Sequence, residues 1–340
     1  MSSALSRATV DHNRRRLLGV GIGLGAVALL PSPVRADTSV KGQLVLYTSQ
    51  LLQDAQQTAA AFKRVYPNVE VKWIRDGTTQ LLTKLRAEFA AGSPQPDVLL
   101  IADALAMAGL KHEGRLAPYL DAAADGLPRQ LRDHDGYWYG TKLITTGIAY
   151  NTAAQKEPRR WWDLADATGQ IAMPSPLYSG AATVMLESFV QDGALGWKYY
   201  EALAHARAIA QGGNGGVFRK VAGGAKLYGI MVDFLAIRSQ QKGSPIRFAF
   251  PEEGVSAVTE PVAVLKTARN VPAARAFVDF VLSRTGQQLI AHQGMLPARS
   301  DVTPPPGFPK ADQIKLLDLD VERALRTVQA DKQRFSSLFA

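Results

Sequence analysis

Hydroxyl side chains and glycines recur at the points where a short apolar run gives way to a helical pattern. The segments Tyr47-Thr48-Ser49-Gln50, Gly77-Thr78-Thr79 and Tyr178-Ser179-Gly180-Ala181 all have this character. The first turn of a helix offers free backbone N–H groups at the positive end of the helix dipole, which together bind phosphate, sulfate or carboxylate. The alternative for each hydroxyl is a cap on its own helix. The predicted anion-binding residues are Ser49, Thr78, Thr79, Ser179, Gly180 and Ala181.

Sequence motifs of catalysis are absent from the chain. It contains no Gly-x-Ser-x-Gly elbow, no Walker loop, no His-Glu-x-x-His and no cysteine, which excludes thiol, zinc-thiolate and iron–sulfur chemistry. The five histidines are scattered beside charged or amide residues, a pattern typical of surface positions. The glycine-rich turn 212–216 lacks the lysine position of a nucleotide-binding loop and suits a flexible turn against a ligand. We therefore expect no enzyme activity, no cofactor and no metal.

Alternating apolar runs and helical periods position these turns. Repeated strand–helix units imply a parallel sheet covered on both faces, which is a doubly wound α/β domain. Two extended stretches without a helix, 137–151 and 257–265, separate two such units. The predicted fold class is therefore α/β, with two doubly wound domains joined by two extended crossings and a cleft between them. Strands are predicted at 43–48, 69–74, 97–101, 169–173 and 227–232, and helices at 49–66, 78–92, 105–112, 181–190, 197–210, 272–289 and 313–334.

These elements divide the chain into domains. Residues 37–142 plus 262–312 are predicted to form domain 1, and residues 143–261 domain 2. The attachment of the C-terminal helix, 313–340, to either domain is left open. Residues 1–36 precede the first strand and are interpreted separately.

The N-terminus is typical of an export signal. Three arginines, Arg14 to Arg16, lead into an apolar stretch of 14 residues that ends at Pro31. A bilayer span needs about 20 apolar residues, so this stretch indicates a signal peptide cleaved after Ala36 and a periplasmic product. The arginine pair before two leucines favours twin-arginine export, and the alternative is an ordinary Sec signal.

The charge of the chain limits the classes of partner that we expect it to bind. The 340 residues carry a formal charge of +9, which by itself suggests a nucleic acid. Five arginines and one aspartate of that total lie in the expected signal peptide, and the other charges are interspersed without a basic run. We therefore expect no nucleic-acid partner, whereas a mildly basic body favours an anionic ligand.

Several short segments together resemble a known family. The segments are Leu44–Ser49, Pro96–Val98, Glu113–Pro118, Ser179–Ala181, Ala263–Lys266, Ala274–Phe280 and Gly286–Gln288. With them the chain resembles the periplasmic solute-binding proteins of ABC importers, in the branch of ferric-ion, phosphonate and sugar-phosphate binders. The resemblance covers most of residues 42–300 and implies a type II periplasmic-binding-protein fold.

The resemblance also implies site residues. It matches Ser179 to Ala181 to the family's anion pocket at a helix terminus, and Asn214 to an amide that assists it. The positions that hold metal ligands in the ferric branch are here Leu51, Ala102 and the pair Asp233-Phe234. None of the typical iron ligands is present, so we reject iron transport.

Three acidic residues remain near the predicted cleft. Asp103 and Asp233 follow strands, and Glu260 lies on the second crossing as a polar contact or hinge residue. A carboxylate beside an anion pocket disfavours a second anion, which favours a ligand that is partly cationic or rich in hydroxyls. The alternative for Asp103 and Asp233 is a solvent-facing loop position. Tyr47, Tyr178 and Phe234 are candidates to pack the body of the ligand, and the alternative for each is packing in the core.

The resulting prediction is a monomeric binding protein that closes around a small organic anion and delivers it to an inner-membrane ABC permease. The first candidate ligand is 2-aminoethylphosphonate, within the class of phosphonates and phosphate esters. One alternative is an exported hydrolase of phosphoryl or acyl substrates with Ser49 or Ser179 as nucleophile, but the sequence supplies no histidine near either serine. The other alternative is a periplasmic sensor subunit.

Overall fold

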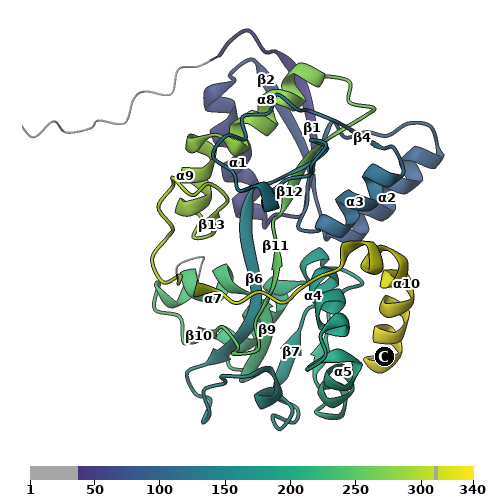
Figure 1. Cartoon of the computed structure of the whole chain (residues 1–340). Helices are drawn as coiled ribbons and strands as arrows, with labels where there is room; N and C mark the ends of the chain where they lie inside the picture. The colour runs from purple at the N-terminus through teal and green to yellow at the C-terminus, as the bar shows by residue number, and fades with distance from the viewer. Residues whose placement is uncertain (1–36, 310–312) are drawn as a thin grey trace, which may run out of the picture. The chain divides into compact units, whose positions relative to one another are not determined.

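A computed structural model describes residues 37–309 and 313–340, and the expected signal peptide lies outside them. These residues form two β-sheets with helices packed on them, as Figure 1 shows. We call each sheet with its own helices a lobe. Among the described residues, no helix is long and apolar enough to cross a membrane.

The first lobe is built on a mostly parallel sheet in the order β2-β1-β3-β12-β4, with β5 paired to β12. Strand β1 pairs in parallel with β2 and β3, whereas β12 runs antiparallel to β3. Side chains alternate between the two faces of a strand, and both faces of β1 are covered. Leu46 belongs to the cluster that contains Phe62 of α1, and Tyr47 to the cluster that contains Leu85 of α2. The strands are β1 (Gly42–Thr48), β2 (Val69–Arg75), β3 (Val98–Leu100), β4 (Leu116–Ala117), β5 (Tyr139–Gly140) and β12 (Pro261–Leu265).

The second lobe is built on a sheet in the order β10-β6-β9-β7-β8, with β11 and β13 also paired to β6. Strand β7 pairs in parallel with β8 and β9, while β6 runs antiparallel to its neighbours. Its core includes an aromatic cluster in which the ring centroids of Trp161 and Phe189 lie 4.7 Å apart and the two ring planes meet at 68°. The strands are β6 (Lys142–Asn151), β7 (Ile171–Met173), β8 (Ile209–Ala210), β9 (Tyr228–Val232), β10 (Ile246–Ala249), β11 (Ser256–Val258) and β13 (Leu296–Pro297).

Helices follow most strands and cover the sheets. The first lobe carries α1 (Leu52–Val65), α2 (Thr78–Ala90), α3 (Ala104–His112), α8 (Val271–Leu282), α9 (Arg284–His292) and the 3-10 turn η1 (Arg129–Leu131). The second lobe carries α4 (Gly180–Gln191), α5 (Gly196–His205), α6 (Asn214–Ala222), α7 (Asp233–Gln240) and the 3-10 turn η2 (Trp161–Leu164). The last helix, α10 (Val321–Leu338), contacts α4 and α5 of the second lobe and α3 of the first.

Two extended segments connect the lobes, and the chain passes between them a third time from α9 to β13. The first runs from β5 into β6, and the second runs from β11 into β12. They lie side by side, because the backbone N–H groups of Thr141 and Lys142 both donate to the carbonyl oxygen of Thr259, at 2.9 and 3.2 Å. The predicted α/β architecture with two extended crossings is confirmed. The domain boundaries at 142/143 and 261/262 remain a proposal, in which these two segments act as the hinge.

Some predicted element boundaries are wrong, for local reasons. The helix predicted at 272–289 is two helices, because Ser283 leaves helical geometry and its hydroxyl caps α9 by accepting from Gly286 N. The helix predicted at 197–210 ends at His205, and Ile209–Ala210 pair instead with β7. Residues 314–320 are not helical, and α10 begins only at Val321, with Asp320 as its cap.

Candidate functional site

A cavity of about 500 Å³ is lined by residues of both lobes. Cavities of roughly 300–1,000 Å³ hold small ligands in other proteins. Turns after strands supply most of its wall, as the sequence predicts. Its lining includes Ser49, Gln50, Asp54, Arg75, Gly77, Thr78, Lys142, Tyr178, Ser179, Gly180, Ala181, Asn214, Arg219, Phe234 and Glu260.

The second-lobe wall is made by the beginnings of α4 and α6. Ser179 caps α4, since its Oγ accepts from the backbone N–H of Ala182 at 3.3 Å. The Asn214 side chain links the two helix starts: its Nδ2 donates to Ser179 Oγ at 3.3 Å, and its Oδ1 accepts from Val232 N at 3.0 Å. The starts of both helices therefore line the cavity next to each other, and N–H groups left free at a helix start stabilise an anion.

The first-lobe wall brings Thr78 and Ser49 to the same cavity. Thr78 is the first residue of α2, and Gly77 is its N-cap, so the prediction of Thr78 or Thr79 as the cap is wrong. The Thr78 side chain is buried, and its Oγ1 has no hydrogen-bond partner among the described residues. Ser49 Oγ accepts from Ala102 N at 2.9 Å, so it does not cap α1. A buried hydroxyl without a partner costs free energy, which a ligand oxygen at this position would recover.

The two walls touch at the edge of the cavity, where a glycine of each lobe lies against a backbone carbonyl group of the other lobe. A Cβ atom at Gly180 would lie 2.5 Å from the carbonyl oxygen of Ala102 and 2.8 Å from Thr78 Oγ1. A Cβ atom at Gly77 would lie 2.7 Å from the carbonyl oxygen of Tyr178. Only glycine permits approaches this close, so the arrangement is one in which the lobes are closed on each other.

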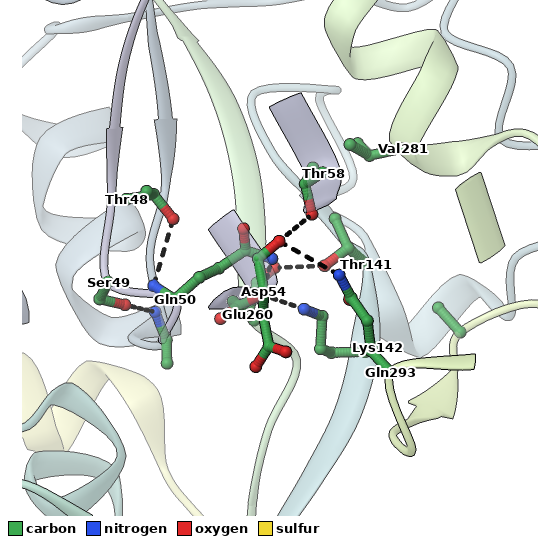
Figure 2. A network of polar contacts seen from close by, with 12 residues as sticks. Thr48, Ser49, Gln50, Asp54, Thr58, Thr141, Lys142, Glu260, Val281 and Gln293 are labelled. Atoms are coloured by element: carbon green, nitrogen blue, oxygen red, sulfur yellow. Dashed lines mark hydrogen bonds and ion pairs between the residues drawn. The ribbon is translucent and has the colours of Figure 1, made fainter. Parts of the chain in front are cut away.

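A buried ion pair joins the two crossings at the cavity, as Figure 2 shows. Lys142 Nζ, at the start of β6, pairs with Glu260 Oε2, on the second crossing, and both side chains are at most 5 % exposed. Gln50 Nε2 donates to the same carboxylate at 3.3 Å, which leaves Gln50 Oε1 buried with no partner among the described residues. Burial raises the pKa of Glu260, while Lys142 and Gln50 favour its charged form. Glu260 has a positive φ of 38°, a conformation that side chains rarely adopt and that surrounding contacts must maintain.

The charges around the cavity do not cancel. Asp54 is paired with Arg238 at 3.2 Å, and Glu260 is paired with Lys142. Arg75 and Arg219 also line the cavity, and neither forms an ion pair among the described residues. Arg75 Nε donates to Gln50 O at 2.7 Å, which fixes its position and leaves its terminal nitrogens available. Arg75, half-buried in the first lobe, and Arg219, exposed on the second lobe, are therefore the two lining residues whose positive charge has no acidic partner among the described residues.

Three predicted site residues do not line the cavity. Asp103 is buried as the N-cap of α3, its Oδ1 accepting from Ala106 N at 2.9 Å. Asp233 is buried beneath β6, where its Oδ2 accepts from Thr145 N at 3.0 Å and from Thr145 Oγ1 at 2.8 Å. The solvent-facing alternative is therefore wrong for both carboxylates, and their hydrogen bonds hold them in the protein rather than at the cavity wall. Thr79 lies beside the cavity, where its N–H donates to Tyr178 O at 3.4 Å.

Part of the cavity lining was not predicted from the sequence. Arg75, Arg219, Lys142 and Gln50 were not predicted as site residues. Arg75 ends β2 and immediately precedes the predicted turn, so the strand-end rule could have found it. Of the three aromatic candidates, Tyr178 and Phe234 line the cavity, whereas Tyr47 is buried in the first-lobe core and donates to Glu88 at 2.6 Å.

Residues 93–323 match the family model of bacterial extracellular solute-binding proteins. The chain belongs to this family. A protein of Haemophilus influenzae described as uncharacterized is 27 % identical over 318 residues, which cover 87 % of this chain and 90 % of that protein.

Two solved structures are similar in fold. The periplasmic binding protein AfuA of Actinobacillus pleuropneumoniae, with exogenous fructose-6-phosphate bound, has a TM-score of 0.78 and 24 % identity, covering 87 % of this chain and 97 % of that one. Iron-bound HitA of Pseudomonas aeruginosa has a TM-score of 0.74 and 21 % identity, covering 86 % and 99 %. The fold of this chain is thus that of type II periplasmic binding proteins, as the resemblance in the sequence implies.

Proposed function

We propose that the protein is the periplasmic solute-binding component of an ABC importer and that it captures a small phosphorylated or phosphonylated organic anion between its lobes. The charge of the residues that line the cavity is the observation that supports an anionic ligand. Asp54 and Glu260 each have a cationic partner, and Arg75 and Arg219 remain. A ligand with about two negative charges compensates both arginines, and phosphate monoesters and phosphonates approach that charge near neutral pH.

The anionic head belongs at the convergent helix starts. The N–H groups of Gly180 and Ala181 begin α4, and Asn214 begins α6 beside them. Thr78 Oγ1, buried and unpartnered, can donate to the same head from the first lobe. A head held from both sides stabilises the closed arrangement over the open one, which is how binding energy drives closure.

The tail of the ligand meets a hydrogen-bond acceptor. Gln50 Oε1 has no partner among the described residues, because Glu260 holds the amide nitrogen. A hydroxyl or amine on the ligand satisfies this oxygen. The candidate 2-aminoethylphosphonate loses the support of Asp103 and Asp233, since both carboxylates are bonded elsewhere. Hydroxylated phosphate monoesters therefore come before it in our proposal.

The comparisons support this choice over iron. AfuA is described with fructose-6-phosphate bound, and HitA with iron. Leu51, Ala102 and the pair Asp233-Phe234 take the places predicted for iron ligands. Leu51, Ala102 and Phe234 line the cavity but have no side-chain oxygen or nitrogen, and Asp233 does not line it, because its carboxylate accepts from Thr145. Among the described residues there is also no group of three or more histidines or acids arranged to hold a metal ion.

Export, delivery and the monomeric state complete the proposal. Residues 1–36 act as the signal peptide, and the closed, loaded monomer delivers its ligand to an inner-membrane permease. The hydrolase alternative receives no support, because among the described residues the hydroxyls of Ser49 and Ser179 accept from backbone N–H groups and from the Asn214 amide, none of which is a base. A sensor subunit would use the same closure, and only the membrane partner distinguishes it.

Calorimetry with a matched ligand series tests the proposal. The series is glycerol 3-phosphate, fructose 6-phosphate, 2-aminoethylphosphonate, ethanesulfonate and ferric citrate, each added to the mature protein. We expect the phosphate esters to bind, and Arg75→Met and Arg219→Met each to weaken them about ten- to a hundredfold, because a charge-assisted hydrogen bond contributes ~1.5–3 kcal/mol. Arg64→Met, on an exposed part of α1, removes the same charge away from the cavity and should bind normally. Binding of iron alone, or equal losses in all three variants, would refute the proposal.

A further inference from the structure

The C-terminal helix connects the two lobes at a place separate from the crossings and the cavity. Helix α10 is anchored on the second lobe by Phe335, which is 2 % exposed and packs edge-on against Tyr200 of α5 at 5.5 Å. Arg334 adds an ion pair with Glu201 of α5 at 2.9 Å. Thr327 Oγ1 donates to Glu187 of α4 at 3.0 Å. This side of the helix therefore belongs to the second lobe.

Another side of α10 lies along α3 of the first lobe. Glu322 Oε1 is 3.7 Å from His112 Nε2, near the end of α3. One helical turn later, Leu325 faces Gly109, where a Cβ atom would lie 3.8 Å from Leu325 Cδ2. Lys332 interacts electrostatically with Asp103, the cap at the beginning of α3. Residues 322, 325 and 332 fall on one stripe of a helix, so α10 and α3 pack antiparallel along this length.

Ionisable side chains are buried where α3, α4 and α10 meet. Asp103 is 4 % exposed and Glu187 is fully buried. Lys332 is half-buried and interacts electrostatically with both carboxylates, and it forms no ion pair within 4 Å of either among the described residues. Glu187 Oε1 has no hydrogen-bond partner among the described residues. The other ionisable groups facing this cluster are Asp331, Arg323 and Arg86, together with the buried hydroxyl of Tyr200 on α5, which interacts with Glu187.

We propose that α10 is a strap that holds the first lobe against the second, and that the carboxylates of Asp103 and Glu187 make this closure sensitive to pH. The proposal rests on the proposed function only in assuming that the lobes separate and close. Opening at the crossings moves α3 away from α4 and α10, which hydrates Asp103 and exposes one side of the cluster. The strap acts whether or not a ligand is present.

The sign of the pH dependence follows from burial. Desolvation raises the pKa of Asp103 to about 6 and that of Glu187 to about 7, and it lowers the pKa of Lys332. A carboxyl whose pKa is higher in the closed state than in the open state favours closure at low pH, and this advantage is lost as pH rises through the closed-state pKa. For Asp103 alone, against its ordinary value of 3.8, the closure equilibrium falls about tenfold between about pH 5 and about pH 8.

Interlobe distances measured on labelled protein test the strap without any ligand. The sequence has no cysteine, so Lys63→Cys on α1 and Lys198→Cys on α5, both exposed, give two unique labelling positions for energy transfer. In this background, Gly109→Leu places a large side chain against Leu325 and should lower the closed fraction about tenfold. Gly109→Ala is the matched control, because its Cβ makes only an ordinary contact. Equal interlobe distances in the two variants would overturn the proposal that α10 holds the lobes together.

The same labelled protein tests the pH response. We expect the interlobe distance to lengthen from pH 5 to pH 8 and this change to disappear in the double variant Asp103→Asn/Glu187→Gln. Asparagine still caps α3, and glutamine still accepts from Thr327, so the variant retains the fold. An unchanged pH profile in the double variant would refute the role of the carboxylates. Failure of every phosphate ester to bind would refute the proposed ligand and leave these distance measurements unaffected.

Discussion

Adding one methyl group at Gly180 should separate ligand binding from folding. Gly180 is the first residue of α4, and its Cβ in the closed arrangement would lie 2.5 Å from the carbonyl oxygen of Ala102 in the other lobe. An ordinary contact needs about 3.4 Å, so a backbone group must move by roughly 1 Å. Overpacking of this kind costs ~1–3 kcal/mol, and the lobes can avoid it by opening. Within α4 itself, alanine is a better helix former than glycine by up to about 1 kcal/mol.

The expected result for Gly180→Ala is therefore a weaker ligand affinity by about five- to 150-fold with no loss of unfolding temperature in the free protein. Titration calorimetry with glycerol 3-phosphate gives the affinity, and calorimetric unfolding gives the stability. Gly193→Ala serves as the control, because a Cβ atom there has no neighbour within 4 Å. Unchanged affinity in Gly180→Ala, or a loss of stability as large as the loss of affinity, would refute the argument that this glycine permits closure.

Three further predictions concern charge. The double variant Arg75→Met/Arg219→Met should bind an uncharged analogue as well as the natural protein binds it, while losing the phosphate ester, as calorimetry will show. Lys142→Met leaves Glu260 buried without its cation and should destabilise the fold by about 3–5 kcal/mol in urea unfolding, whereas adding Glu260→Gln should restore much of that loss. Burial raises the pKa of Asp233 to about 7, above its ordinary 3.8, so its contribution to stability is full below that ordinary value and lost as pH rises through about 7. Asp233→Asn should flatten this part of the pH–stability profile, and an unchanged slope would contradict it.

Much of the fold follows from local pattern. The run at 43–48 is apolar on both faces, and the structure covers it with α1 on one face and α2 on the other. Helix ends were harder to predict where a short strand or a second helix follows directly. Ile209 and Ala210 continue the apolar periodicity of α5, yet pairing with β7 takes them into a sheet. Propensity cannot show such pairing, because the partner strand is more than thirty residues away in the sequence.

The helix starts at which we propose the anion binds follow from the sequence for a similar reason. A helix start after a parallel strand has free N–H groups wherever it lies, and Ser179, Gly180 and Asn214 occupy such starts. The cations were not predictable in this way. Arg75 and Lys142 resemble any other charged residue at a strand end, and only the folded structure shows that Lys142 has a carboxylate partner while Arg75 has none.

The two misplaced aspartates show the limit of the strand-end rule. A carboxylate directly after a strand can accept from a ligand, or it can accept from the N–H groups of the helix that follows, and the sequence pattern is the same for both. Asp103 caps α3, and Asp233 accepts from Phe234 N at 2.6 Å as well as from Thr145. Each carboxylate compensates backbone donors that would otherwise be buried without a partner. Removing them from the list of ligand groups leaves a cavity whose unpaired charges are both positive, and this balance, more than any single contact, favours a dianionic ligand.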